Sequence, residues 1–164
     1  MVRPRLRALC KTQGAVSAMI GWLRFHNIPF ALRSGGHCFE GFSQSDSVVV
    51  DTRLMNAIDI DTATETVTTG PGSSLGALYD AVGVRGYALS AGNCTTVGVA
   101  GHALGGGSGY LSRQFGFLCD SLQSIDSGGA RIRQVSPVVL SRFGLDVPVL
   151  VKLVQFLVSV RTNS

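Results

Sequence analysis

The sequence predicts an α+β fold, and three observations support this prediction. Apolar residues make up 45% of the chain and charged residues 15%, which is typical of an ordered globular protein. The length of 164 residues suits one domain with a proper hydrophobic core. Segments of helical periodicity and short strand-like runs follow one another without regular alternation, which favours α+β.

The first third of the chain predicts a strand, a helix and two further strands. Residues 5–10 indicate a short strand, and Thr12 can cap a helix that should end near Asn27, because Pro29 follows. Residues 29–34 and 47–52 are typical of buried strands, the first of which completes a parallel strand–helix–strand unit. The helix packs on this sheet through an apolar stripe at positions i, i+3, i+4 and i+7, formed by Val16, Met19, Ile20 and Leu23.

The remaining elements are shorter. Residues 56–61 and 66–72 predict two strands with a turn between them, and residues 122–125 and 130–135 predict a final hairpin. Between these pairs, Ser73 or Ser74 can cap a second helix. Its apolar residues have the same helical spacing and are Leu75, Leu78, Tyr79 and Val82. The stretch 92–116 is so rich in glycine that few positions remain for packed side chains, and we expect a ligand to approach it.

Charge and hydropathy exclude two classes of partner. The formal net charge is +4, but four of the basic residues crowd the first strand, and no nucleic-acid motif or row of stacking aromatics accompanies them. We interpret this as a solvated strand face and expect no nucleic-acid partner. Charged residues and a proline interrupt the apolar stretch 138–160, so we expect no membrane span.

The four cysteines are widely spaced and form no C-x-x-C pair, so neither a zinc site nor a dithiol redox site is predicted, and we expect no metal. The first 11 residues lack the apolar core of a signal peptide. We therefore expect a cytoplasmic protein with reduced thiols, in which Cys38 and Cys119 are core residues.

Glycine-rich nucleotide motifs do not fit. No glycine is followed by lysine, which excludes a P-loop, and Tyr110 or Ser112 stands where the last glycine of G-x-G-x-x-G should be. A nucleophile elbow around Ser108 fails in the same way. Two bare segments remain, residues 33–37 and 92–110, whose backbone N–H groups could receive an anion.

Three ordered motifs resemble one family. "RSGGHCFEG" (33–41), "SAGNCTTVGVAGHALGGG" (90–107) and "SRQFGFLCDSL" (112–122) are similar to the FAD-binding domain (PCMH-type) of the vanillyl-alcohol oxidase superfamily, and specifically to the berberine-bridge-enzyme-like oxidases. The resemblance runs from about Arg3 to about Ile125. It implies an oxidoreductase that takes hydride from alcohol-like, sugar-like or alkaloid-like small molecules onto FAD, which oxygen then reoxidises.

The same resemblance implies the site residues. In this family the histidine of the first motif, here His37, is bonded to the flavin methyl group, and bicovalent members add a cysteine, here Cys94, on the neighbouring ring carbon. His102 would contact the flavin without bonding to it, or make a structural hydrogen bond. The diphosphate would be wrapped by Arg33, Ser34, Gly35, Gly36, Thr95, Thr96, Gly98 and Val99. The rest of the flavin would be lined by Gly101, Gly105, Gly106 and Gly107.

The resemblance stops near residue 137. We expect residues 1–136 to form a partial FAD-binding domain, with residues 137–164 as a divergent apolar tail and without the substrate domain that supplies the family's catalytic base. The implied fold is thus incomplete, with an N-terminal lobe and part of the second. Our hypothesis is a truncated or frameshifted product, or a fragment whose C-terminal half is encoded separately. A noncatalytic flavin-binding or interaction module and a nonfunctional gene product remain as alternatives.

Overall fold

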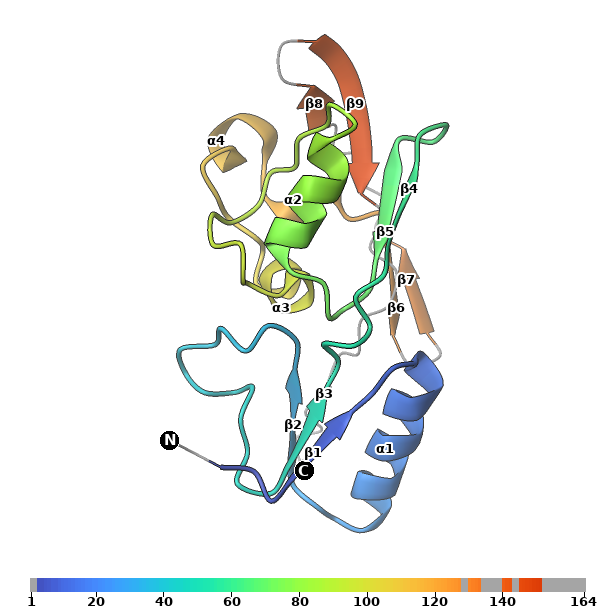
Figure 1. The fold of residues 1–164 in the computed structure, drawn as a ribbon, viewed down its shortest axis with the longest axis vertical. Coiled ribbons are helices and arrows are strands. Elements are labelled where there is room, and N and C mark those ends of the chain that lie inside the picture. The colour runs from blue at the N-terminus through green and yellow to red at the C-terminus, as the bar shows by residue number, and fades with distance from the viewer. Residues whose placement is uncertain (1–2, 128–129, 134–139, 143–144, 152–164) are drawn as a thin grey trace.

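A three-stranded parallel sheet covered by one helix forms the first lobe of the molecule (Figure 1). The computed structural model describes residues 3–127, 130–133, 140–142 and 145–151. The strand order is β1-β3-β2, so the third strand along the chain lies in the centre. The elements are β1 (Leu6–Leu9), α1 (Gln13–Phe25), β2 (Phe30–Arg33) and β3 (Val48–Asp51).

Helix α1 begins and ends where the sequence predicts. The Thr12 hydroxyl accepts a hydrogen bond from the Ala15 amide at 3.2 Å, which satisfies one of the free N–H groups of the first turn. The chain leaves the helix at Asn27, whose φ is 53°. Val16 and Leu23 are fully buried in a cluster with strand β3, so the predicted apolar stripe is confirmed as the face that packs on the sheet.

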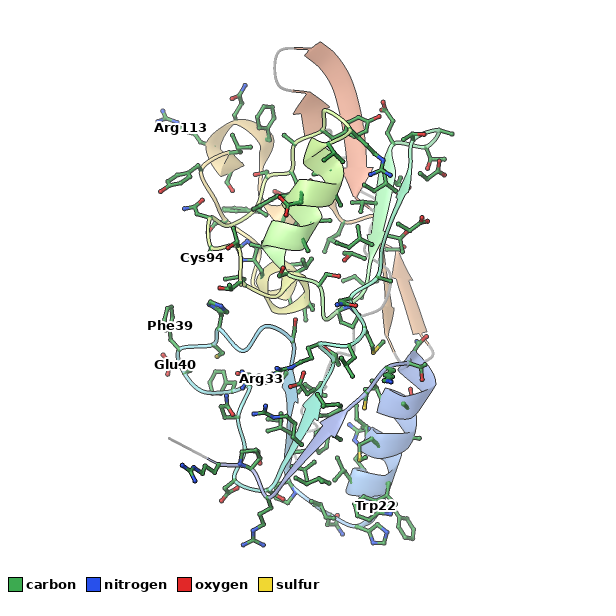
Figure 2. The ribbon with its side chains drawn as sticks, viewed as in Figure 1. Trp22, Arg33, Phe39, Glu40, Cys94 and Arg113 are labelled. Carbon is green, nitrogen blue, oxygen red and sulfur yellow. The ribbon has the colours of Figure 1, made fainter. Side chains whose placement is uncertain are left out.

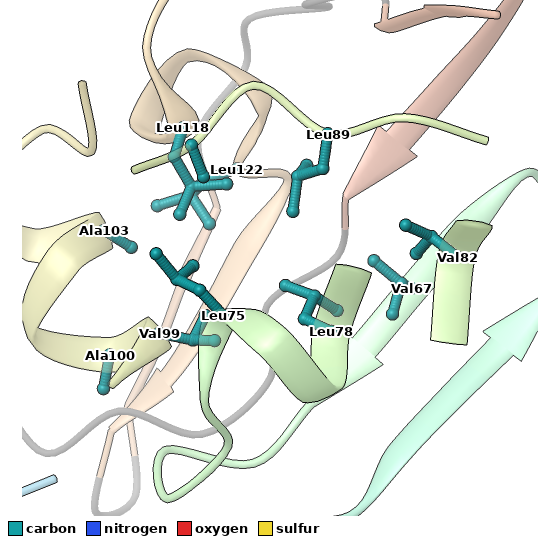
Figure 3. Packing of buried hydrophobic residues seen from close by; sticks show 11 residues of the cluster. Val67, Leu75, Leu78, Val82, Leu89, Val99, Ala100, Ala103, Leu118 and Leu122 are labelled. Atoms are coloured by element: carbon teal, nitrogen blue, oxygen red, sulfur yellow. The ribbon is translucent and has the colours of Figure 1, made fainter. Parts of the chain in front are cut away.

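The second lobe is built around one nine-residue helix. Ser74, one of the two predicted caps, accepts a hydrogen bond from the Ala77 amide at 3.3 Å. The apolar face of this helix packs between strand β5 and helix α3, as Figure 3 shows for Leu75 and Leu78. The elements are β4 (Ile58–Asp61), β5 (Thr66–Thr69), α2 (Leu75–Gly83), α3 (Val99–Leu104), α4 (Ser112–Phe115) and the 3₁₀ turn η1 (Leu118–Ser121).

The glycine-rich stretch contains more structure than its composition suggests. Two short helices, α3 and α4, lie within it, and Val99, Ala100 and Ala103 are buried in the core of the second lobe. The expectation that this stretch carries few packed side chains is confirmed, because these three are the buried side chains among residues 92–116. Their small size allows α3 to approach Leu75 and Leu118 closely (Figure 3).

Two further strand pairs follow. The predicted hairpin is confirmed as β6 (Ser124–Ser127) and β7 (Ala130–Arg133), although residues 128–129 and 134–135 lie outside the described part. Within the apolar tail, β8 (Leu140–Arg142) pairs with β9 (Leu145–Val151), and β9 runs parallel to β5. The rest of the tail lies outside the described residues. No helix among the described residues is long and apolar enough to span a bilayer. The fold class is α+β, as predicted.

Candidate functional site

The two glycine-rich segments of the sequence touch each other between the lobes. A Cβ on Gly35 would lie 2.2 Å from the Gly98 nitrogen, and a Cβ on Gly98 would lie 2.2 Å from the Ser34 Oγ. Ser34 also donates a hydrogen bond to the Pro71 carbonyl at 2.6 Å. The bare backbone at these two positions is therefore required by the other segment, and both glycines also line a cavity.

One cavity of about 590 Å³ is lined by both predicted nucleophiles, His37 and Cys94. Figure 2 shows how this arises, because Cys94 lies on the second lobe and faces the loop of the first lobe that carries Phe39 and Glu40. Both His37 and Cys94 are exposed rather than buried. The size is within the usual range for ligand pockets. The apolar part of the lining consists of Leu32, Phe39, Phe42, Pro71, Val97, Ala100 and Leu104.

His37 is oriented by a residue of the opposite segment. Its Nε2 lies 2.9 Å from the Thr96 hydroxyl oxygen, and either atom can be the donor depending on the tautomer. This contact engages one ring nitrogen and leaves Nδ1 as the nitrogen available for another partner.

Cys94 lies in a turn that hydrogen bonds hold at its C-terminal side. The Val97 amide donates to the Cys94 carbonyl at 3.2 Å, and the Gly76 amide at the start of α2 donates to the Thr95 carbonyl at 2.8 Å. The Leu75 amide likewise donates to the Val97 carbonyl at 2.9 Å. The thiol is thus presented to the cavity by a backbone that the N-terminal turn of α2 fixes.

His102 lies on α3 and takes part in a structural hydrogen bond. The Gly92 amide donates to its Nε2 at 2.8 Å, and burial lowers the pKa of the imidazole, which keeps the ring neutral and able to accept. His102 also lines the cavity. The two roles that the sequence suggested for it are therefore compatible.

A buried carboxylate organises the basic end of the site. Asp51 is fully buried at the end of β3, and the Arg53 guanidinium binds it with contacts of 3.0 Å and 3.1 Å from Nε and 2.8 Å from the terminal nitrogen. Arg33 lies 4.0 Å from the same carboxylate. Arg33 and Arg53 line a second cavity of about 220 Å³ together with Ser73 and Thr96. Two guanidinium groups and hydroxyls suit an anion such as phosphate.

Several predicted residues lie away from the large cavity. Val99 is buried in the core, and Gly107 is packed against Leu118, where a Cβ would lie 2.4 Å from that side chain. Thr95 packs against the start of α2 at Gly76. The cavity lining also lacks Gly105 and Gly106, which follow α3. The predicted residues that do line it are Arg33, Ser34, Gly35, Gly36, His37, Cys94, Gly98, Gly101 and His102.

The structure corrects one cysteine prediction and adds residues. Cys38 is exposed and lines the cavity, because it follows His37 in the same exposed turn, so its prediction as a core residue is wrong. Cys119 is partly buried and packs against the core cluster, in line with its prediction. Phe39 and Phe42 also line the cavity and were not predicted as site residues. Their place just after His37 was the signal that could have found them.

The residues present fit a flavin. The large cavity combines apolar walls, which suit a planar aromatic ring system, with an imidazole and a thiol on opposite segments. Gly101 faces open space, so backbone can approach a ligand there. The smaller cavity beside it supplies positive charge for a phosphate group.

Comparisons with known proteins agree with this chemistry. A sequence model of the family described as "FAD binding domain" matches residues 4–127. The chain is 42% identical over 99 residues to aclacinomycin-N/aclacinomycin-A oxidase of Streptomyces galilaeus, covering 58% of this chain and 18% of that protein. It is 35% identical over 136 residues to reticuline oxidase of Eschscholzia californica, covering 78% of this chain and 25% of that protein.

The fold is also similar to that of solved structures. A crystal structure of 6-hydroxy-D-nicotine oxidase from Arthrobacter nicotinovorans superposes with a TM-score of 0.73 and 33% sequence identity. The superposition covers 82% of this chain and 30% of that one. The chain therefore spans less than a third of the length of these relatives.

Proposed function

Because the chain belongs to the FAD binding domain family, we propose that it is the flavin-binding part of a bicovalent oxidoreductase, with FAD bonded to His37 and Cys94. The observation that carries this proposal is the single cavity lined by both side chains, which come from opposite lobes. When bound, FAD accepts hydride from a substrate C–H bond and is reoxidised by oxygen. The relatives are oxidases named for aclacinomycin, reticuline and 6-hydroxy-D-nicotine, so we propose alkaloid-like, alcohol-like or sugar-like substrates.

His37 is suited to bond formation through Nδ1. A neutral imidazole is a nucleophile near neutral pH, and the Thr96 hydroxyl engages Nε2 at 2.9 Å. With the proton on Nε2 and Thr96 accepting it, the Nδ1 lone pair is free to attack carbon. Thr96 therefore selects the tautomer and the orientation of the ring.

Cys94 is suited to the second bond because its thiol is exposed in the cavity and its backbone is fixed. Thiolate is the reactive form. Each attachment would be a two-electron oxidation: His37 would replace one C–H bond of the flavin methyl group with a C–N bond, and Cys94 would replace the C–H bond of the neighbouring ring carbon with a C–S bond. In each case the two hydrogens would leave with oxygen as hydrogen peroxide, so atoms and electrons balance.

The diphosphate of FAD fits the smaller cavity, with Arg33 and Arg53 held beside Asp51. The guanidinium groups would neutralise the phosphate charge, and the hydroxyls of Ser73 and Ser74 are available as donors. The isoalloxazine ring then occupies the larger cavity, which shares Arg33, Ser34, Gly35 and Gly98 with the smaller one.

The test is to purify the complete 164-residue chain with FAD and precipitate it with acid. We expect yellow colour in the pellet, and peptide mass mapping should place flavin on both His37 and Cys94. His37→Ala and Cys94→Ala should each leave one bond, and the double variant should release all colour to the supernatant. Colour released from the wild-type protein would contradict covalent attachment.

Two control variants sharpen this test. His26→Ala removes an exposed histidine at the end of α1, far from the cavity, and should retain both bonds. Cys38→Ala removes the second thiol of the cavity and identifies which cysteine is bonded. Bleaching of the visible spectrum on addition of a sugar, an alcohol or an alkaloid then distinguishes turnover from flavin binding alone.

A further inference from the structure

Side chains from two helices take both backbone hydrogen-bonding groups of Gly92. The Tyr79 hydroxyl on α2 donates to the Gly92 carbonyl, and the Gly92 amide donates to His102 Nε2 on α3 at 2.8 Å. A Cβ at residue 92 would lie 2.8 Å from the His102 ring, so glycine permits this close approach. Gly92 is thus held between the two helices that form the core of the second lobe.

We propose that Tyr79 is a positioning residue for Cys94, which it fixes through Gly92 so that the thiol can bond to the flavin. The proposal rests on the function proposed above. Tyr79 does not line the 590 Å³ cavity that contains the Cys94 thiol, and it lines a separate cavity of about 450 Å³ together with Gly92. Its effect on Cys94 is therefore indirect.

The geometry around Cys94 explains why a tether is needed at Gly92. Residues 93–96 are exposed, and no residue of this stretch belongs to the hydrophobic core, so hydrogen bonds of the flanking backbone largely fix the position of Cys94. The C-terminal side of the turn is held by α2 through the bonds to the Thr95 and Val97 carbonyls. The two hydrogen bonds of Gly92 hold the N-terminal side of the turn that carries Cys94. Hydrogen bonds therefore hold the chain on both sides of Cys94. The Tyr79 hydroxyl makes one of the two hydrogen bonds of Gly92 on the N-terminal side.

Burial keeps both partners in the protonation states that these bonds need. It raises the pKa of Tyr79 to about 12, so the hydroxyl remains a donor at neutral pH. It lowers the pKa of His102, so Nε2 remains an acceptor. The tether is thus formed throughout the neutral range.

Tyr79→Phe removes the hydroxyl and keeps the ring that packs against the core cluster. Gly92 also lines the 450 Å³ cavity, which has room for a water in place of the lost donor, so we expect the variant to fold. Tyr110→Phe is the matched control, because Tyr110 lines the same cavity but is exposed and lies on another segment.

The first measurement is amide hydrogen exchange of the flavin-free chain. Loss of one hydrogen bond should speed exchange of the hydrogen-bonded Gly92 and Val97 amides, on either side of Cys94, by about fivefold in Tyr79→Phe. Exchange in Tyr110→Phe should match the wild type. Unchanged exchange in Tyr79→Phe would overturn the positioning role without bearing on flavin attachment.

The second measurement is peptide mass mapping after incubation with FAD. We expect the Cys94-linked fraction in Tyr79→Phe to fall about fivefold at a fixed early time, while the His37-linked fraction stays at the wild-type level. An equal loss at both residues, or no loss at Cys94, would overturn the proposal. Absence of flavin on Cys94 in the wild type would contradict the proposed bicovalent function. The exchange data on the flavin-free chain test the positioning role of Tyr79 separately from that outcome.

Discussion

The loop that carries His37 and the turn that carries Cys94 are held in different ways. Hydrogen bonds from α2 and α3 reach both sides of the Cys94 turn. Residues 35–44 of the His37 loop have one hydrogen bond to another segment among the described residues, between His37 and Thr96. The loop is instead anchored at its base by Ser34, by the Gly35–Gly98 contact and by the end of β2.

The difference bears on the proposed attachment of flavin to the two residues. Hydrogen bonds order the backbone of the Cys94 turn when the chain folds. The entropic cost of ordering this backbone is therefore part of folding and not of flavin binding. The imidazole lies on a loop whose base is anchored and whose tip is held to another segment by the hydrogen bond between His37 and Thr96. Substitutions at the base of the His37 loop, at its tip and in the Cys94 turn should therefore have different effects on stability and on flavin attachment.

Gly98→Ala should have the largest effect, because it disrupts the base of the His37 loop and the Cys94 turn at the same time. A Cβ there would lie 2.2 Å from Ser34 Oγ and 2.4 Å from the Gly35 nitrogen, and the backbone of Gly35 has no room to move aside. We expect destabilisation of about 3 kcal/mol, at the upper end for overpacking, and loss of flavin binding. Urea unfolding and the visible spectrum measure these two effects.

Gly21→Ala is the control for this substitution. It lies in α1, where a Cβ would meet nothing within 4 Å, so it should stabilise the protein by about 0.5–1 kcal/mol. Equal unfolding midpoints for wild type and Gly98→Ala would show that the two segments do not touch.

Asp51→Asn should release the base of the His37 loop and leave the Cys94 turn intact. The carboxylate is fully buried and faces the guanidinium groups of Arg7, Arg33 and Arg53, which lose their counter-charge. Because the arginines remain partly exposed to water, we expect the free energy of unfolding to fall by about 2 kcal/mol, which is less than the cost of breaking a fully buried pair. Urea unfolding measures this loss.

Asp59→Asn is the control for this substitution. Asp59 is an exposed residue of β4, so the change should alter the free energy of unfolding by less than about 0.5 kcal/mol. In peptide mapping, the His37-linked fraction should fall more than the Cys94-linked fraction in Asp51→Asn. The reverse order would show that the loop base does not control His37.

Local sequence signals predicted the elements of the fold well. The Thr12 and Ser74 caps and the apolar spacing of α1 and α2 depend on residues within a few positions of one another, so a window of sequence contains the physical cause. The short helices α3 and α4 were missed because glycine lowers helix propensity, while tertiary packing of Val99 and Ala103 outweighs it.

The site could be predicted only in part. The convergence of His37 and Cys94 on one cavity follows from the family resemblance of their motifs. The Asp51 cluster and the bonds of Gly92 join residues that are distant in sequence and of common types, and no local pattern marks them. Cys38 was misassigned because cysteine is usually buried, whereas this one shares an exposed turn with His37.

Thr96→Val should act at the tip of the His37 loop. The change replaces the hydroxyl that contacts His37 Nε2 with a methyl group of similar volume, and both residues are exposed, so stability should change by less than about 0.5 kcal/mol. We expect slower flavin attachment at His37 and an unchanged rate at Cys94, measured by peptide mapping over time. This is the mirror image of Tyr79→Phe, and similar patterns in the two variants would contradict independent control of the two bonds.

The smallest effect should come from pH acting on the Cys94 turn through His102. Burial lowers the pKa of this imidazole from its ordinary value of 6.5, so just below pH 6.5 the unfolded chain binds a proton that the folded chain does not. The stability that neutral His102 contributes is therefore complete above pH 6.5 and declines as the pH falls below it.

Protonation also removes the lone pair that accepts from the Gly92 amide, so the Cys94 turn should loosen at acidic pH before the His37 loop does. Urea unfolding of wild type and His102→Asn at about pH 5 and about pH 8 measures the linkage, and the variant should lose less stability between these values. Hydrogen exchange, corrected for its intrinsic pH dependence, should accelerate at the Gly92 amide more than at the Gly41 amide of the His37 loop. Equal acceleration in both segments would mean that His102 does not tether the turn, and that the ordered state of Cys94 depends on α2 alone.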